Sequence, residues 1–234
     1  MAHLLRAESA EDLGYKLALI DIQVAPRSAG RTTEQTERFS IAHLLSSLPK
    51  DRLAFPLTVE HGDRPDCVVT FNEGSIGIEL TETVPENVAR ASALRQSGLG
   101  PQCYFIPRAL RGEPPRSTVE LRREITFDKA GPPWVGDAPE REWANAMLHF
   151  AAVKVDKAHK PGFVLHPRNW LLIYDNWPLP AVRRAEASSI LAGHCAAAGI
   201  FNTFDRVFVL SSNVLCEIYE RVELHQVFNP SAAK

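Results

Sequence analysis

The stretch that decides the fold is RPDCVVTFNEGSIGIELTE, residues 64–82, in which two short apolar runs flank a polar turn. Runs of this kind, bounded by turn-forming residues, are typical of a β-hairpin. The two expected strands nevertheless carry the acids Asp66, Glu79 and Glu82. A carboxylate in a core sheet is costly unless it is compensated, so the hairpin is also where function is to be sought.

The apolar pattern of the hairpin selects a register, because strand side chains alternate between the two faces. Pairing Phe71 with Ile76 gathers three apolar pairs of the two strands on one face. It places Asp66 and Glu79 on the other face as diagonal neighbours about 5–8 Å apart. A slip of one residue would mix apolar and acidic side chains on both faces. In this register Glu82 lies on the face opposite to Glu79.

Two carboxylates this close repel each other unless a proton, a basic side chain or a hard metal ion lies between them. Oxygen ligands favour Mg²⁺ or Mn²⁺, and such ions keep open positions for water and phosphate. A bound ion of this kind promotes phosphodiester hydrolysis by lowering the pKa of water and neutralising charge. The sequence therefore predicts a magnesium or manganese site at Asp66 and Glu79.

Helices on both sides of the hairpin carry charged residues on their apolar faces. Residues 33–48 show helical apolar periodicity, and the same stripe continued back by one turn meets Glu37. Residues 137–157 predict a long helix whose inward stripe ends in Lys154 and Lys157. For these lysines the alternative is snorkelling, in which the stems cover the core and the ammonium groups reach water.

The hairpin resembles a known nuclease signature. Pro65-Asp66 followed by Glu79-Leu80-Thr81 is similar to the motif of the PD-(D/E)XK nuclease superfamily, whose members have the restriction-endonuclease-like fold. In that family the proline and aspartate open one strand, and the acid-x-lysine lies on its hairpin partner. The third motif position here is Thr81 instead of lysine.

The resemblance implies a fold, an activity and a set of ligands. Residues 33–176 resemble the family's αβββαβ core, a mixed central sheet flanked by helices. The implied activity is metal-dependent hydrolysis of phosphodiester bonds, in DNA more than in RNA, with Mg²⁺ or Mn²⁺ as the cofactor. The implied metal ligands are Asp66, Glu79 and the backbone carbonyl of Leu80, with Glu37 as an acid that binds the ion directly or through water.

The missing motif lysine leaves two interpretations open. Family members are known to move this lysine to a neighbouring helix, and Lys154 or Lys157 is then the expected transition-state cation. The alternative is a catalytically inactive module that keeps the fold and serves in nucleic-acid binding or assembly. Many nucleases of this fold form dimers, which makes a homodimer a further expectation by analogy.

The rest of the chain predicts alternating helices and strands in a single domain over residues 1–234, with an N-terminal extension at 1–32. A Pro/Gly/Arg-rich surface insertion is expected at about residues 98–137, where the arginines of residues 90–123 form either a solvated loop or a contact for phosphates. Further expected strands are residues 15–24, 54–61, 117–127 (strand or hairpin), 169–176, 206–212 and 214–224, and further expected helices are 85–96 and 181–198.

The composition and motif content of the chain limit the classes of function that are expected. The chain has 26 Lys+Arg and 28 Asp+Glu residues, so no global basic field indicates nucleic acid. The four scattered cysteines favour a reducing cytoplasm, and no apolar run reaches the length of a membrane span. Zinc-protease, nucleophile-elbow, phosphate-loop and dinucleotide-binding motifs are missing from the sequence.

Overall fold

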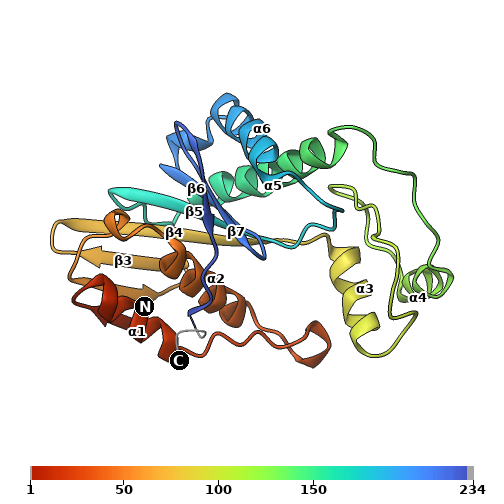
Figure 1. Cartoon of the computed structure of the whole chain (residues 1–234), viewed down its shortest axis with the longest axis horizontal. Coiled ribbons are helices and arrows are strands. Elements are labelled where there is room, and N and C mark those ends of the chain that lie inside the picture. Colours follow the sequence, from red (N-terminus) through yellow and green to blue (C-terminus); the bar gives the residue numbers. More distant parts are fainter. Residues whose placement is uncertain (1, 231–234) are drawn as a thin grey trace.

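The computed structural model describes residues 2–230, which contain an eight-stranded mixed sheet with helices on both faces (Figure 1). The strands are β1 (Ala2–Ala7), β2 (Leu57–His61), β3 (Cys67–Phe71), β4 (Gly74–Thr83), β5 (Arg168–Asp175), β6 (Arg206–Leu210), β7 (Val214–Ile218) and β8 (Val222–Gln226). Their order in the sheet follows the chain. Pairing is parallel for β4–β5 and β5–β6 and antiparallel elsewhere, which confirms the expected mixed sheet.

The helices divide into two covering layers and an outlying pair. They are α1 (Ala10–Leu19), α2 (Thr33–Ser47), α3 (Glu86–Gln96), α4 (Thr118–Phe127), α5 (Ala138–Ala158) and α6 (Arg184–Ala197), with short 3-10 turns η1 (Arg27–Ala29), η2 (Lys50–Arg52) and η3 (Ile200–Asn202). Helices α1 and α2 lie on one face of the sheet, α5 and α6 on the other, and α3 and α4 lie beyond its end (Figure 1). Among the described helices, none is both long and apolar enough to cross a membrane.

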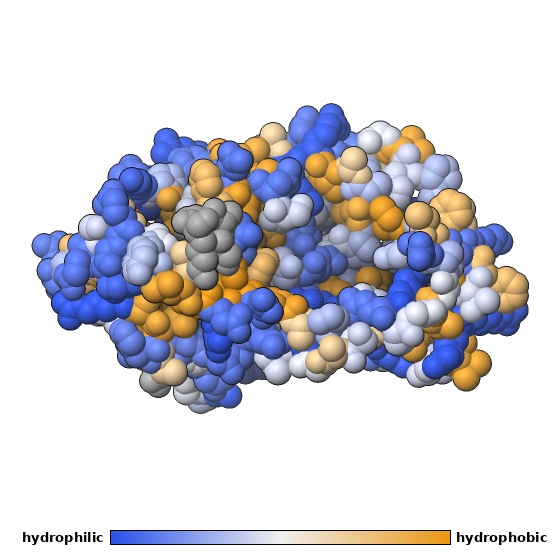
Figure 2. All heavy atoms as spheres, turned by 60° about the horizontal axis from the view of Figure 1, so that its bottom comes forward, coloured by the Kyte–Doolittle hydropathy of each residue, from blue (hydrophilic) through white to orange (hydrophobic). Residues whose placement is uncertain are grey.

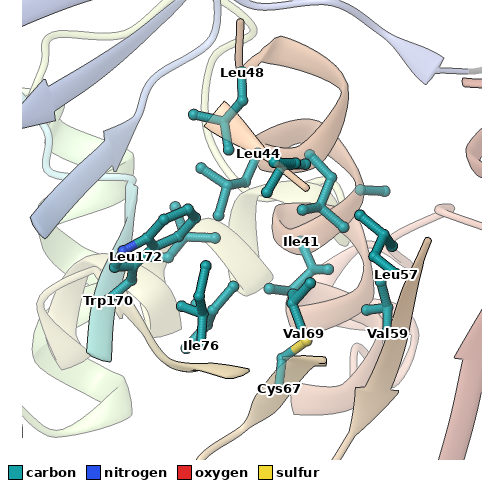
Figure 3. Close-up of a cluster of buried hydrophobic side chains, with 14 of the residues drawn as sticks. Ile41, Leu44, Leu48, Leu57, Val59, Cys67, Val69, Ile76, Trp170 and Leu172 are labelled. Atoms are coloured by element: carbon teal, nitrogen blue, oxygen red, sulfur yellow. The ribbon is translucent and has the colours of Figure 1, made fainter. Parts of the chain in front are cut away.

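Two buried clusters hold the layers together. On one face Ile41 and Leu44 of α2 share a cluster with Val69 and Ile76 of the hairpin (Figure 3). On the other face Trp143 and Met147 of α5 pack with alternate residues of β5 and β6. Figure 2 shows the surface of one side of the molecule, where hydrophilic residues surround smaller hydrophobic patches. The helical stripe expected for residues 33–48 is therefore confirmed as the buried face of α2.

The strand expected at residues 15–24 is wrong, because this part of the chain begins within helix α1. Ser9 caps that helix by accepting a hydrogen bond from the backbone N–H of Asp12. Leu13 and Leu17 are both buried, and their spacing of four residues fits one helix face. The edge strand β1 precedes this helix and pairs with β2, so the segment expected as an extension contributes to the sheet.

The strand or hairpin expected at residues 117–127 is also wrong, because these residues form helix α4. Ser117 and Glu120 form a reciprocal capping box at its start. Leu121 and Ile125, one turn apart, pack in a small cluster with Ala91 of α3. The single strand expected at residues 214–224 is instead two strands, β7 and β8, which pair as a hairpin.

The hairpin at residues 64–82 forms, but its register is shifted by two residues from the predicted one. Phe71 pairs with Gly74 instead of Ile76, which leaves a two-residue turn, a common hairpin loop length. A shift of two keeps every side chain on its predicted face. Continuing the ladder by one residue sets Asp66 level with Glu79, so the acids are direct instead of diagonal neighbours.

Thiol labelling checks the packing of the sheet. Cys67, Cys195 and Cys216 are buried and Cys103 is exposed. Burial raises the pKa of Cys195 to about 12 and that of Cys216 to about 11, and it raises the pKa of Cys67 further. A thiol reagent at pH 8 is therefore expected to label one cysteine per native chain and all four in denaturant. Rapid labelling of a second native thiol would contradict this packing.

Candidate metal centre

A notch at the edge of β4 holds the candidate site. The ladder between β3 and β4 ends at the pair Cys67–Ile78, whereas β4 stays paired with β5 as far as Thr83. The edge of β4 beyond Ile78 is therefore not covered by β3. Asp66, which directly precedes β3, enters this notch, and its Oδ2 accepts a hydrogen bond of 2.6 Å from the backbone N–H of Leu80.

Two lysines of α5 meet the two acids in this notch. The Nζ atoms of Lys154 and Lys157 lie 2.7 and 2.6 Å from Glu79 Oε1. The same ammonium groups lie 3.6 and 3.9 Å from the oxygens of Asp66. Asp66 and Glu79 are buried, with exposed fractions of 5% and 1%. The structure thus brings four residues of the sequence-based site together, and the lysine stems point their ammonium groups at acids.

The cluster changes the acidity of its members. Burial raises the pKa of Asp66 to about 6; the charges of Glu79 and Glu37 add to the rise, while Lys154 and the Leu80 N–H oppose it. Burial alone would lower the pKa of Lys157. The hydrogen bond to Glu79 and the charge of Asp66 outweigh that effect and raise it. The cluster therefore stays together through compensation between opposite charges in a poorly solvated place.

Glu37 is held by a histidine that the sequence did not single out. Its Oε2 lies 2.7 Å from Nε2 of His61, the last residue of β2. The chain turns directly after this residue, where Gly62 N–H donates to the carbonyl of Asp66 at 2.9 Å. The sequence signal that could have identified His61 is its closeness to the Pro65-Asp66 pair. Glu37 lies beside the acid cluster, and its contact in the structure is with His61.

Some arginines of residues 90–123 contact partners in their own segment, whereas Arg108 and Arg111 contact Glu142 and Asn145 of α5. Arg90 donates to the carbonyl of Arg116, which in turn pairs with Glu113 and Glu124. Arg95 lies over the ring of Tyr104, 3.9 Å from its centroid. These contacts brace α3 against α4 and the loops around them, and a contact with phosphates stays a prediction.

A second acidic group lies on the hairpin of β7 and β8. Ligand atoms of Glu217, Glu223 and His225 lie within 4.8 Å of one another. Every carboxylate oxygen there already has a partner: Arg206 and His225 bind Glu217, and Arg52 and Tyr219 bind Glu223. Sequence reasoning missed this group, whose members contact one another across the turn between β7 and β8. The arrangement is that of a compensated ion-pair network.

An unpaired oxygen distinguishes the notch from this network. Glu79 Oε2 is buried and has no hydrogen-bond partner within residues 2–230. A buried acceptor without a partner is costly and is a suitable position for a cation. Oxygen donors from two carboxylates fit Mg²⁺ or Mn²⁺. A scan against protein-family models and searches of curated proteins and of solved structures found no match.

Proposed function

We propose that the chain is a metal-dependent nuclease related to the PD-(D/E)XK superfamily, hydrolysing phosphodiester bonds in DNA more than in RNA. The observation that carries this proposal is the convergence of Asp66, Glu79, Lys154 and Lys157 in a buried notch. These residues come from the position directly before β3, from β4 and from α5. Two carboxylates and two ammonium groups at the free edge of a strand can hold a metal ion and a phosphate together.

The order of the elements supports the same proposal. Helix α2, strands β2 to β4, helix α5 and strand β5 follow one another as α, β, β, β, α and β. Helices α3 and α4 stand between β4 and α5 as an addition to this series. The parallel pairing of β4 with β5 closes it, since such a connection needs a crossover helix. This order of elements agrees with that of the restriction-endonuclease-like core.

The proposed ion would be held by the carboxylates of Asp66 and Glu79 and the carbonyl of Leu80. The N–H of Leu80 points to Asp66, and the N–H and C=O of one strand residue point to the same side. Glu37 would join this set through water, because its carboxylate is held at His61. When bound, the ion supplies an acidified water and a positive charge at the phosphate.

The lysines would take the place of the motif lysine that is Thr81 in this chain. Both Nζ atoms lie within hydrogen-bond distance of Glu79 Oε1. Ammonium groups placed here can donate to a phosphate oxygen and stabilise the negative charge that develops on it. Lys154 is the better placed of the two, because it is less exposed and lies nearer to Asp66. Lys157 retains more contact with water and completes the neutralisation.

A specific observation favours the second candidate function, an inactive nucleic-acid-binding or assembly module. The two lysines already neutralise both acids, so the acid pair does not by itself demand an ion. In that case the cluster joins α5 to the sheet as a buried ion-pair network. DNA and a second copy of the chain are the proposed partners in either function.

Plasmid cleavage tests the proposal. Supercoiled DNA incubated with the protein and Mg²⁺ or Mn²⁺ is expected to become nicked or linear, and EDTA is expected to stop the reaction. An end-labelled linear duplex then separates internal cuts from digestion at the ends. Intact DNA with either metal, together with measurable DNA binding, would contradict the nuclease proposal and support the inactive module.

A further inference from the structure

A cavity of about 310 Å³ adjoins the metal centre on the side of α2. It lies between the start of that helix and the free edge of β4, and it shares Glu37, Leu80 and Thr81 with the surroundings of the acid cluster. Its polar lining includes Arg27, Arg31, Thr33, Thr36, Glu82 and Tyr174. A hollow of this size matches a small ligand, and none of the proposed metal chemistry uses these side chains.

The arginines of the cavity are incompletely satisfied. Nη2 of both Arg27 and Arg31 contacts Oε1 of Glu82, at 3.2 Å for Arg31, and Asn176 donates to the same oxygen at 2.8 Å. This oxygen thus accepts hydrogen bonds from Arg27 and Asn176, whereas its contact with Arg31 is an ion pair without hydrogen-bond geometry. Arg31 Nη2 is buried without a hydrogen-bond partner within the described residues. Two guanidinium groups share the single carboxylate of Glu82, while Glu37, the other acid of the lining, contacts His61. The arginines therefore offer a free donor that suits an anion.

Free hydroxyl groups line the same cavity. The side chains of Thr33 and Tyr174 make no hydrogen bond through their hydroxyls within residues 2–230. Thr33 lies in the first turn of α2, where Thr32 caps the N–H of Gln35 and the earlier backbone N–H groups lack acceptors in their own helix. Hydroxyls, arginines and such N–H groups together form a donor set suited to a phosphate with its sugar.

The ring of Tyr174 gives the cavity an aromatic wall. The guanidinium of Arg31 lies 5.9 Å from the ring centroid, and the ring of Phe39 lies 5.3 Å away. An aromatic ring next to an arginine is a platform on which a base can stack. We propose that this cavity binds one nucleotide of the strand beside the cleaved phosphate, with its phosphate on Arg27 and Arg31 and its base against Tyr174. The proposal rests on the nuclease function for the strand that it holds.

Calorimetric titration of the metal-free protein with deoxyadenosine monophosphate in EDTA tests this cavity without requiring cleavage. Arg31→Ala is expected to weaken binding about tenfold, the effect of losing one charged hydrogen bond. Arg38→Ala is the matched control, since Arg38 lies on α2, close in sequence to Arg31, and within the described residues it pairs only with the exposed Glu34. Glu82→Gln is expected to tighten binding severalfold, because it releases both arginines from their carboxylate.

The base and the phosphate are tested separately. Deoxyadenosine and inorganic phosphate are each expected to bind more weakly than the nucleotide, and Tyr174→Leu is expected to remove the advantage of the nucleotide over phosphate. Thermal melting checks that each variant is folded. Absence of nucleotide binding, equal effects of Arg31→Ala and Arg38→Ala, or equal affinity for phosphate and nucleotide would overturn the assignment. Loss of the nuclease function would show differently, as nucleotide binding in EDTA without cleavage in Mg²⁺.

Discussion

Replacing Asp66 with asparagine is expected to abolish Mn²⁺ binding in the notch and to reduce Mg²⁺-dependent DNA cleavage by about 10³-fold. A bound ion contributes several kcal/mol to such a reaction, and each ~1.4 kcal/mol is a factor of ten in rate. The amide oxygen of asparagine can still accept the hydrogen bond from Leu80 N–H, so the local backbone is expected to persist. The variant therefore removes the charge and keeps the shape.

The measurement pairs a calorimetric titration with Mn²⁺ and a plasmid-cleavage time course. Asp63→Asn is the matched control, because Asp63 lies three residues away and its side chain is 91% exposed. It is expected to bind and cleave like the natural protein. Equal Mn²⁺ binding by Asp66→Asn and Asp63→Asn would contradict the proposed ligand role of Asp66.

Replacing Lys154 with methionine is expected to destabilise the protein by about 3 kcal/mol in EDTA. Added Mn²⁺ is expected to restore part of the lost stability. Removing one partner of a buried ion pair leaves an uncompensated charge, which typically costs 3–5 kcal/mol. Here Lys157 remains and lowers the cost. In this variant Glu79 faces only one ammonium group, so an added Mn²⁺ ion competes with one lysine instead of two for the carboxylate. Binding of the ion then stabilises the folded state by mass action.

Urea unfolding with and without Mn²⁺ measures this effect. Lys50→Met serves as the control, since Lys50 forms a surface ion pair with Glu11 at 3.0 Å and such pairs contribute about 0–1 kcal/mol. The test also separates the two candidate functions. Equal shifts in Mn²⁺ for Lys154→Met and the natural protein would contradict competition between the ion and the lysine. Destabilisation without any effect of Mn²⁺ would favour the inactive ion-pair network.

Apolar periodicity was sufficient to place the acids on their faces. The alternation in residues 64–82 set Asp66 and Glu79 on one side, and a two-residue error in register left that side unchanged. The helical stripe of α5 likewise placed Lys154 and Lys157 on its inner face. Period and face are local properties, and these four residues could be named from the sequence because of them.

Local sequence patterns predicted the wrong secondary structure where apolar runs were short. Residues of α1 and of α4 contain β-branched or aromatic side chains that favour strand, yet capping by Ser9 and by Ser117 starts a helix in each case. Contacts far along the chain then keep it helical, as when Leu121 and Ile125 of α4 bury against α3. Propensity is a weak prior that tertiary packing overrides.

The sequence by itself determined the alternating layers, the inward faces of α2 and α5, and the acid pair, because each follows from the period of apolar residues. Only the tertiary structure decided which distant groups meet at that pair. His61 holds Glu37 across 24 positions, and Arg27 and Arg31 reach Glu82 from more than fifty positions away. Such contacts depend on how the layers pack and where β3 ends beside β4, and no local periodicity encodes either.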